Sequence, residues 1–137
     1  MADLEALIGQ DESASLEFKD ARSLLNTDEK KQEIAKDVSA MANAAGGLIV
    51  YGVGEDSTGV ATALAPIEAR RGLAEWLDQV IANNIEPRVQ GVLIHPIKLA
   101  GDKLAVVVQV PKATSLAPHQ STRHSQYFRR WNRTVQA

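Results

Sequence analysis

The chain has 137 residues and no cysteine, which excludes disulfides, zinc-finger sites and thiol catalysis. Hydrophobic residues make up 45% and charged residues 23%, which is typical of an ordinary globular domain. The net charge of −2 hides a basic C-terminal end. No apolar run could span a bilayer, and the acidic N-terminus lacks a signal-peptide core. We therefore expect a single cytoplasmic domain over residues 1–137 without a membrane segment.

The first strand is predicted over residues 14–19, where apolar and charged residues alternate. Leu16 and Phe18 are expected to face a core, and Glu17 and Lys19 to face the other way. The charged pair is interpreted further below, because charges on a strand are ordinary by themselves.

A helix is predicted to follow, with Asn26 as its N-cap and Glu29 three residues later, as in a capping box. Its apolar face recurs at helical spacing, at Ile34, Val38 and Met41. Gly46-Gly47 is expected to end the helix and to let two backbone segments approach closely.

The rest of the chain predicts a second helix and more strands. The helix is expected to begin at Pro66, and the strands are expected at Leu48–Val53, Val89–Leu99, Leu104–Val110 and Gln126–Trp131. Ala100–Lys103 is the expected hairpin turn between the second and third of these strands. We therefore predict an α+β fold, a two-layer α/β arrangement in which a mixed sheet of about six strands packs with two main helices.

The glycine-rich turn after the Leu48–Val53 strand does not complete a nucleotide-binding motif. Gly52-x-Gly54 starts like a dinucleotide fingerprint, but Ser57 stands where the third glycine is needed. Gly54 and Gly59 have P-loop spacing, but Val60-Ala61 replaces the required Lys-Ser/Thr pair. No nucleotide cofactor is expected.

Four acids lie in or near the first strand and in the turn after the Leu48–Val53 strand. They are Glu12, Glu17, Glu55 and Asp56. If the first strand pairs beside Leu48–Val53, two or three of these carboxylates could meet at one edge. Such a cluster would bind a hard divalent cation, which could activate water against a phosphodiester. The alternative is that each is a solvated surface acid.

The C-terminal segment is basic. Four arginines and no acid lie between His119 and Ala137, at Arg123, Arg129, Arg130 and Arg133. Arginine binds phosphate in a bidentate manner, and His119 could also contact phosphate. Aromatic residues interleave with these arginines, and exposed aromatics stack on unpaired bases. The alternative is that a basic tail only keeps the chain soluble.

The order of these motifs resembles the Schlafen/AlbA-type nucleic-acid-binding domain family. The resemblance covers about Gly9 to Arg133. It is carried by Glu12-Ser13, Glu17-Phe18-Lys19, Ser39-Ala40-Met41-Ala42-Asn43, Gly46-Gly47, Gly52-Val53, Glu55-Asp56, Val110-Pro111, Pro118-His119 and Tyr127-Phe128-Arg129.

The resemblance implies two activities. Bacterial members are similar to DNA-binding modules of transcriptional regulators, whereas some Schlafen proteins cut structured RNA with three metal-binding acids. Glu12 and Glu17 match two of those acids, and Glu55 stands where the third is an aspartate, with Asp56 next to it. Lys19 would offset phosphate charge near a metal. Family nucleases pair two lobes, so a single lobe implies a homodimer.

We therefore expect a nucleic-acid-binding domain that contacts DNA or RNA phosphates through Arg123, Arg129, Arg130, Arg133 and His119. The alternative is an endoribonuclease that holds Mg²⁺ or Mn²⁺ with Glu12, Glu17, Glu55 and Asp56 and uses Lys19. A third hypothesis is a regulatory or oligomerisation module of a larger protein.

Overall fold

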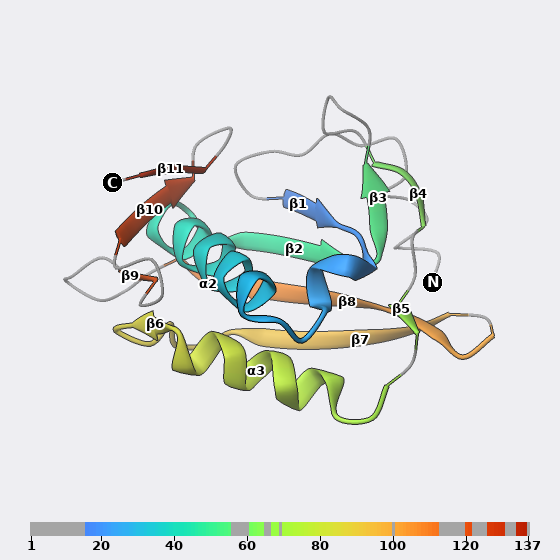
Figure 1. Cartoon of the computed structure of the whole chain (residues 1–137). Helices are drawn as coiled ribbons and strands as arrows, with labels where there is room; N and C mark the ends of the chain where they lie inside the picture. Colours follow the sequence, from blue (N-terminus) through green and yellow to red (C-terminus); the bar gives the residue numbers. More distant parts are fainter. Residues whose placement is uncertain are drawn as a thin grey trace.

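The computed structural model describes residues 16–55, 61–64, 67–68, 70–99, 101–112, 120–121, 126–130 and 134–136. In chain order its elements are β1 (Leu16–Lys19), the 3-10 helix η1 (Ala21–Leu24), α2 (Asp28–Asn43), β2 (Gly47–Tyr51), β3 (Val53–Glu55), β4 (Ala61–Leu64), β5 (Ile67–Glu68), α3 (Leu73–Asn83), β6 (Ile85–Glu86), β7 (Leu93–Leu99), β8 (Lys103–Val110), β9 (Gln120–Ser121), β10 (Gln126–Arg130) and β11 (Thr134–Gln136). Figure 1 shows α2 and α3 on the same side of the main sheet, so the predicted α+β fold with two main helices is confirmed.

The main sheet has five strands and is mixed. β1 runs parallel to β2, and β2 runs antiparallel to β8. The outer strand β7 pairs along nearly the whole of β8, whereas β5 pairs only with its first two residues. A second, four-stranded sheet has the order β11-β10-β9-β6, and β3 and β4 form a separate two-stranded ribbon.

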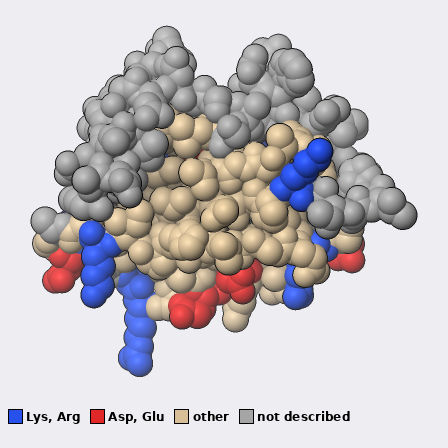
Figure 2. Space-filling view, turned by 180° about the vertical axis from the view of Figure 1, so that it is seen from behind, with Lys and Arg blue, Asp and Glu red and all other residues tan. Residues whose placement is uncertain are grey.

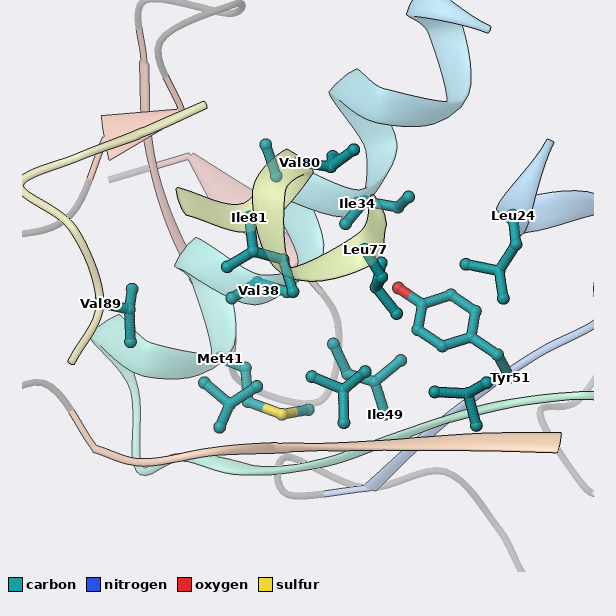
Figure 3. Packing of buried hydrophobic residues seen from close by; sticks show 14 of the residues in the cluster. Leu24, Ile34, Val38, Met41, Ile49, Tyr51, Leu77, Val80, Ile81 and Val89 are labelled. Carbon is teal, nitrogen blue, oxygen red and sulfur yellow. The ribbon is translucent and has the colours of Figure 1, made fainter. Parts of the chain in front are cut away.

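The larger core lies between the helices and the main sheet. Its members include Ile34, Val38 and Met41 of α2, and Ile49 and Tyr51 of β2. Figure 3 shows these side chains meeting Leu77, Val80 and Ile81 of α3 above the sheet. The apolar stripe predicted for the first helix is therefore the stripe that α2 buries, which stabilises the helix by removing apolar surface from water.

A second, smaller cluster lies on the opposite face of the sheet. Phe18, Val50, Val53 and Ala105 are its buried members. Val50 and Ala105 alternate with residues of the larger core along β2 and β8, since successive strand side chains point to opposite faces. Seen from behind in Figure 2, the middle of this face carries few charged side chains, and Leu48 and Leu93 are exposed at 37% and 50%.

Gly46 makes a close approach of two backbone segments possible. Its φ of +76° is a left-handed conformation, and a Cβ there would lie 2.6 Å from the Val110 carbonyl oxygen and 2.7 Å from the Lys112 nitrogen. Only glycine avoids both the strain of the left-handed conformation and the steric clash of a Cβ atom. Its amide donates to the Met41 carbonyl oxygen at 2.9 Å, which binds the end of α2 to the start of β2. The close approach expected at this glycine pair is therefore found.

Four predicted boundaries are wrong. The strand predicted from Val89 begins at Leu93 as β7, and Gly52 divides the strand predicted over Leu48–Val53 between β2 and β3. The second helix begins at Leu73, not at Pro66, because Ile67 is buried and pairs with Leu104 as part of β5. The N-cap of α2 is Thr27, not Asn26, since the Thr27 hydroxyl accepts from the Lys30 amide at 3.2 Å.

The hairpin predicted around Ala100–Lys103 joins β7 to β8. Pro96 lies in the middle of β7 opposite Val106. Proline has no amide hydrogen, so its position fits an outer strand whose nitrogen faces away from the ladder.

Candidate functional site

The charged face of β1 lies beneath α2. In the parallel register, Glu17 stands beside Ile49 and Lys19 beside Tyr51. Ile49 and Tyr51 belong to the core under the helices, so the two charged side chains share that face. The predicted alternation along the first strand is confirmed, but its charged face is covered by the protein.

A lysine joins two buried carboxylates at this place. The Lys19 Nζ atom lies 3.6 Å from Glu17 Oε1 and 3.5 Å from Asp37 Oδ2 of α2. The exposed fractions of the side chains are 27% for Lys19, 9% for Glu17 and 7% for Asp37. We name Glu17, Lys19, Asp37 and Tyr51 the buried charge cluster. Its ion pairs are little screened by water, because low exposure lowers the local dielectric constant.

Burial, together with the nearby Glu17 carboxylate, raises the pKa of Asp37 to about 7, and Lys19 opposes this shift. Burial also raises the pKa of Tyr51 well above its ordinary value, with Asp37 and Glu17 adding to the effect. Asp37 thus changes charge near neutral pH, whereas Tyr51 keeps its proton.

A pocket of about 190 Å³ opens next to the buried charge cluster. Its lining residues come from β1, η1, α2 and β2, and they are Lys19, Ser23, Glu29, Lys30, Glu33, Ile34, Asp37 and Tyr51. The Tyr51 hydroxyl is buried and has no hydrogen-bond partner in the described part of the chain. The pocket therefore combines an ammonium, a hydroxyl and a carboxyl group that can exchange a proton near neutral pH.

A metal ion does not fit between Glu17 and Asp37, because the Lys19 ammonium holds that position. Within the described residues, no three His, Asp or Glu side chains gather as metal ligands would. A metal at Glu17 would need its further ligands from Glu12, Glu55 or Asp56. Glu12 and Asp56 lie outside the described residues, and of Glu55 only the backbone position at the end of β3 is described.

The strand pairing on which the acidic cluster depends is confirmed. β1 pairs with β2, and the Gly52 amide donates to the Lys19 carbonyl oxygen at 2.7 Å. This bond fixes the end of β1 to the point where the chain enters β3. Whether the carboxylates meet stays a prediction.

The C-terminal arginines that are predicted to bind phosphate, which we call the arginine strip, are described only in part. Arg129 and Arg130 lie in β10, which pairs with β11 and contacts α2, and only their backbone is described. Arg123, Arg133 and His119 lie outside the described residues. Their contacts with phosphate stay a prediction.

Sequence reasoning missed Asp37. It lies three residues after Ile34 and four before Met41, which places it on the apolar stripe of α2. A carboxylate on a stripe that must be buried needs a partner, and the cation on the nearest strand was Lys19. A charged residue on the apolar stripe of the predicted helix was therefore the feature of the sequence that could have pointed to this site.

A family model described as Schlafen, AlbA_2 matches residues 12–137. The chain belongs to the Schlafen AlbA_2 family. No curated protein matches the chain in sequence. Among the described residues of this Schlafen AlbA_2 chain, no helix has the length and apolarity that crossing a membrane requires.

Two solved structures share the Schlafen AlbA_2 fold of this chain. The N-terminal domain of a RecG-related protein from Nitrosomonas europaea matches with a TM-score of 0.66 and 20% identity, over 99% of this chain and 86% of that one. The DIP2311 protein from Corynebacterium diphtheriae matches with a TM-score of 0.64 and 20% identity, over 99% of this chain but only 29% of that one. The chain thus spans less than a third of DIP2311.

Proposed function

We propose that this Schlafen AlbA_2 domain binds nucleic acid and contacts its phosphates through the C-terminal arginines. The supporting observation is that β10, with Arg129 and Arg130, is part of a sheet that contacts α2 and so has a fixed place in the fold. Arginines on a fixed strand can meet successive phosphates of a backbone, since each guanidinium binds phosphate in a bidentate manner.

The family and one neighbour support a nucleic-acid role. The Nitrosomonas protein is described as related to the ATP-dependent DNA helicase RecG, and the similar region is its N-terminal domain. We infer that the present chain contacts nucleic acid, with DNA and RNA as the targets to compare.

The test is the salt dependence of binding. Each phosphate contact contributes about 0.9 to the slope of log K against log salt concentration for duplex DNA. We expect Arg129→Ala with Arg130→Ala to weaken binding and to reduce this slope by about 1 to 2. Arg71→Ala with Arg88→Ala is the matched control, because both arginines are exposed elsewhere and the same charge is removed. If both double variants lose nucleic-acid affinity equally, the proposed phosphate contacts of Arg129 and Arg130 are refuted.

A second candidate function is metal-dependent cleavage of RNA with Mg²⁺ or Mn²⁺. It is favoured by Glu17, a buried carboxylate whose strand is fixed to the start of β3 by the bond between Lys19 and Gly52. In that reading Glu12, Glu55 and Asp56 would complete the ligands and Lys19 would offset phosphate charge. The metal would supply the activated water.

Glu17→Gln separates the two functions. A nuclease would lose cleavage of structured RNA in this variant while keeping RNA affinity, and urea unfolding would show that the variant is folded. Wild-type protein that binds RNA but leaves it intact with either metal would exclude the nuclease.

We also propose that the domain acts as a cytoplasmic homodimer, since one chain supplies one lobe and the cysteine-free sequence suits a reducing compartment. Light scattering should then give twice the 14.8 kDa of a single chain. A single protein chain in the free state, and also in the complex with nucleic acid, would contradict the dimer.

A further inference from the structure

A second pocket, away from the buried charge cluster, lies where α2 and α3 face each other. Its volume is about 310 Å³, near the lower end of the range for small-molecule sites. It is lined by Lys31, Trp76, Gln79, Val80, Asn83 and Asn84. No acidic side chain is among these residues, whereas three line the pocket at the buried charge cluster.

Trp76 supplies a flat aromatic wall that is held in place. The ring packs partly against the larger core, and the Arg70 guanidinium lies over it, 4.6 Å from the ring centroid. Arg70 Nη1 in turn donates to the Leu24 carbonyl oxygen at 3.0 Å. Arg70 lines a separate pocket of about 220 Å³. Arg70 thus covers one face of the indole and leaves the other face for a base. Because the ring is oriented before any ligand arrives, the entropy cost of stacking on it is lower.

Amide side chains follow Trp76 along the same side of α3. Gln79 and Asn83 lie three and seven residues after Trp76, so successive helical turns bring all three to one pocket. Asn84 is buried, and its Nδ2 donates to the Val80 carbonyl oxygen at 2.7 Å. An amide presents a donor and an acceptor side by side, which matches the edge of a nucleobase, adenine above all.

We propose that this pocket holds one unpaired nucleobase of a bound nucleic acid. The base stacks on Trp76, its edge meets the amides of Gln79 and Asn83, and the adjoining phosphate lies near Lys31. This inference rests on the proposed nucleic-acid-binding function and adds a base-reading site to the phosphate contacts of the arginine strip. The combination of an aromatic face, two amides and one cation without an acid carries the assignment.

The experiment compares ligands that differ only in their bases. The affinity of the full chain is measured for a labelled oligo(dA), for an abasic oligomer of equal length, and for AMP by competition. We expect the oligo(dA) to bind about tenfold more tightly than the abasic oligomer, because stacking of one base on an aromatic side chain gives a gain of this order. AMP should compete only weakly, since it has one phosphate for the arginine strip.

Variants then locate the effect. Gln79→Ala with Asn83→Ala should reduce the preference for bases several-fold while leaving abasic binding unchanged. Trp76→Ala should abolish the preference and Trp76→Phe should keep much of it, which distinguishes stacking from a loss of folding. Gln90→Ala with Gln109→Ala is the matched control, because both amides are exposed outside the pocket.

Each outcome decides between the proposals. Equal affinity for oligo(dA) and the abasic oligomer would overturn the base pocket but leave phosphate binding standing. A preference for bases that survives in the Gln79 and Asn83 double variant and in Trp76→Ala would also overturn the pocket. Binding of AMP as tight as binding of oligo(dA) would overturn the nucleic-acid source of the base. Binding of neither oligomer would instead refute the proposed function.

Discussion

At the scale of single residues, Asp37 is the most unusual group described. Its carboxyl group is buried near Glu17, Lys19 and Tyr51, with Glu33 and Lys36 on its own helix also acting on it. The pKa of Asp37 rises from 3.8 to about 7, so the folded chain favours its protonated form. A raised acid pKa gives stability that is present below pH 3.8 and lost as the pH rises through about 7.

Asp37→Asn should remove this pH dependence, because an amide keeps the shape of the protonated carboxyl group without titrating. The stability of the variant relative to wild type is expected to rise between pH 3.8 and about 7. The rise should be at most about 1.4 kcal/mol per pH unit. Urea unfolding across this pH range measures it. A difference between the two proteins that does not change with pH would contradict the burial of the charge.

Gly46→Ala should destabilise the fold by about 2–4 kcal/mol, because the new methyl group would meet the Val110 carbonyl and force a left-handed conformation. Gly72→Ala is the matched control. Its φ of +75° equals that of Gly46 within a degree, but nothing lies within 4 Å of its Cβ position. The control should therefore lose only about 1 kcal/mol. Equal losses in thermal or urea unfolding would show that the close approach is not the cause.

The special backbone conformation at Gly46 could be predicted from the sequence, whereas the burial of Asp37 could not. A Gly-Gly pair at a helix end predicts a special backbone conformation. The direction of Glu17 and Lys19 was likewise predictable from the alternation with Leu16 and Phe18. The burial of these charges under α2 was not predictable, because it depends on contacts between segments that are far apart in the chain.

At the scale of elements, local signals located the helices better than their ends. The stripe of Ile34, Val38 and Met41 predicted α2, but two neighbouring polar residues could each have capped it. Pro66 suits a helix start, yet Ile67 gains more from pairing with Leu104 and from burial in the core. Gly52, with a φ of +109°, divides the predicted Leu48–Val53 strand between β2 and β3.

Thr27→Ala should lower the free energy of unfolding by about 1 kcal/mol, since the Lys30 amide loses its capping oxygen. Asn26→Ala serves as the control and should change stability by less than about 0.5 kcal/mol. Circular dichroism during urea unfolding compares the two. A larger loss in Asn26→Ala would restore the cap that the sequence suggested.

At the scale of the whole molecule, the main sheet has buried residues on both faces. Sequence patterns predicted a mixed sheet and its hydrophobic strands. They did not predict the short strands β5, β6 and β9, because two-residue strands are formed by pairing with distant partners and not by local propensity.

Phe18→Ala tests the second face. Phe18 is fully buried opposite the helices, so its loss should cost about 3–5 kcal/mol, as a core cavity does. Leu93→Ala is the control: its register with Gln109 puts it on the same face, but it is half exposed and should cost under about 1 kcal/mol. A small loss at Phe18 in urea unfolding would mean that this face contributes little to stability.

Pro96 in β7 has a consequence for how such domains can be combined. An exposed sheet edge can recruit a strand from another molecule and start aggregation. A proline in the middle of that edge withholds a donor that an incoming strand would need. Copies of the domain can therefore lie close to one another with little tendency of the main sheet to grow through β7.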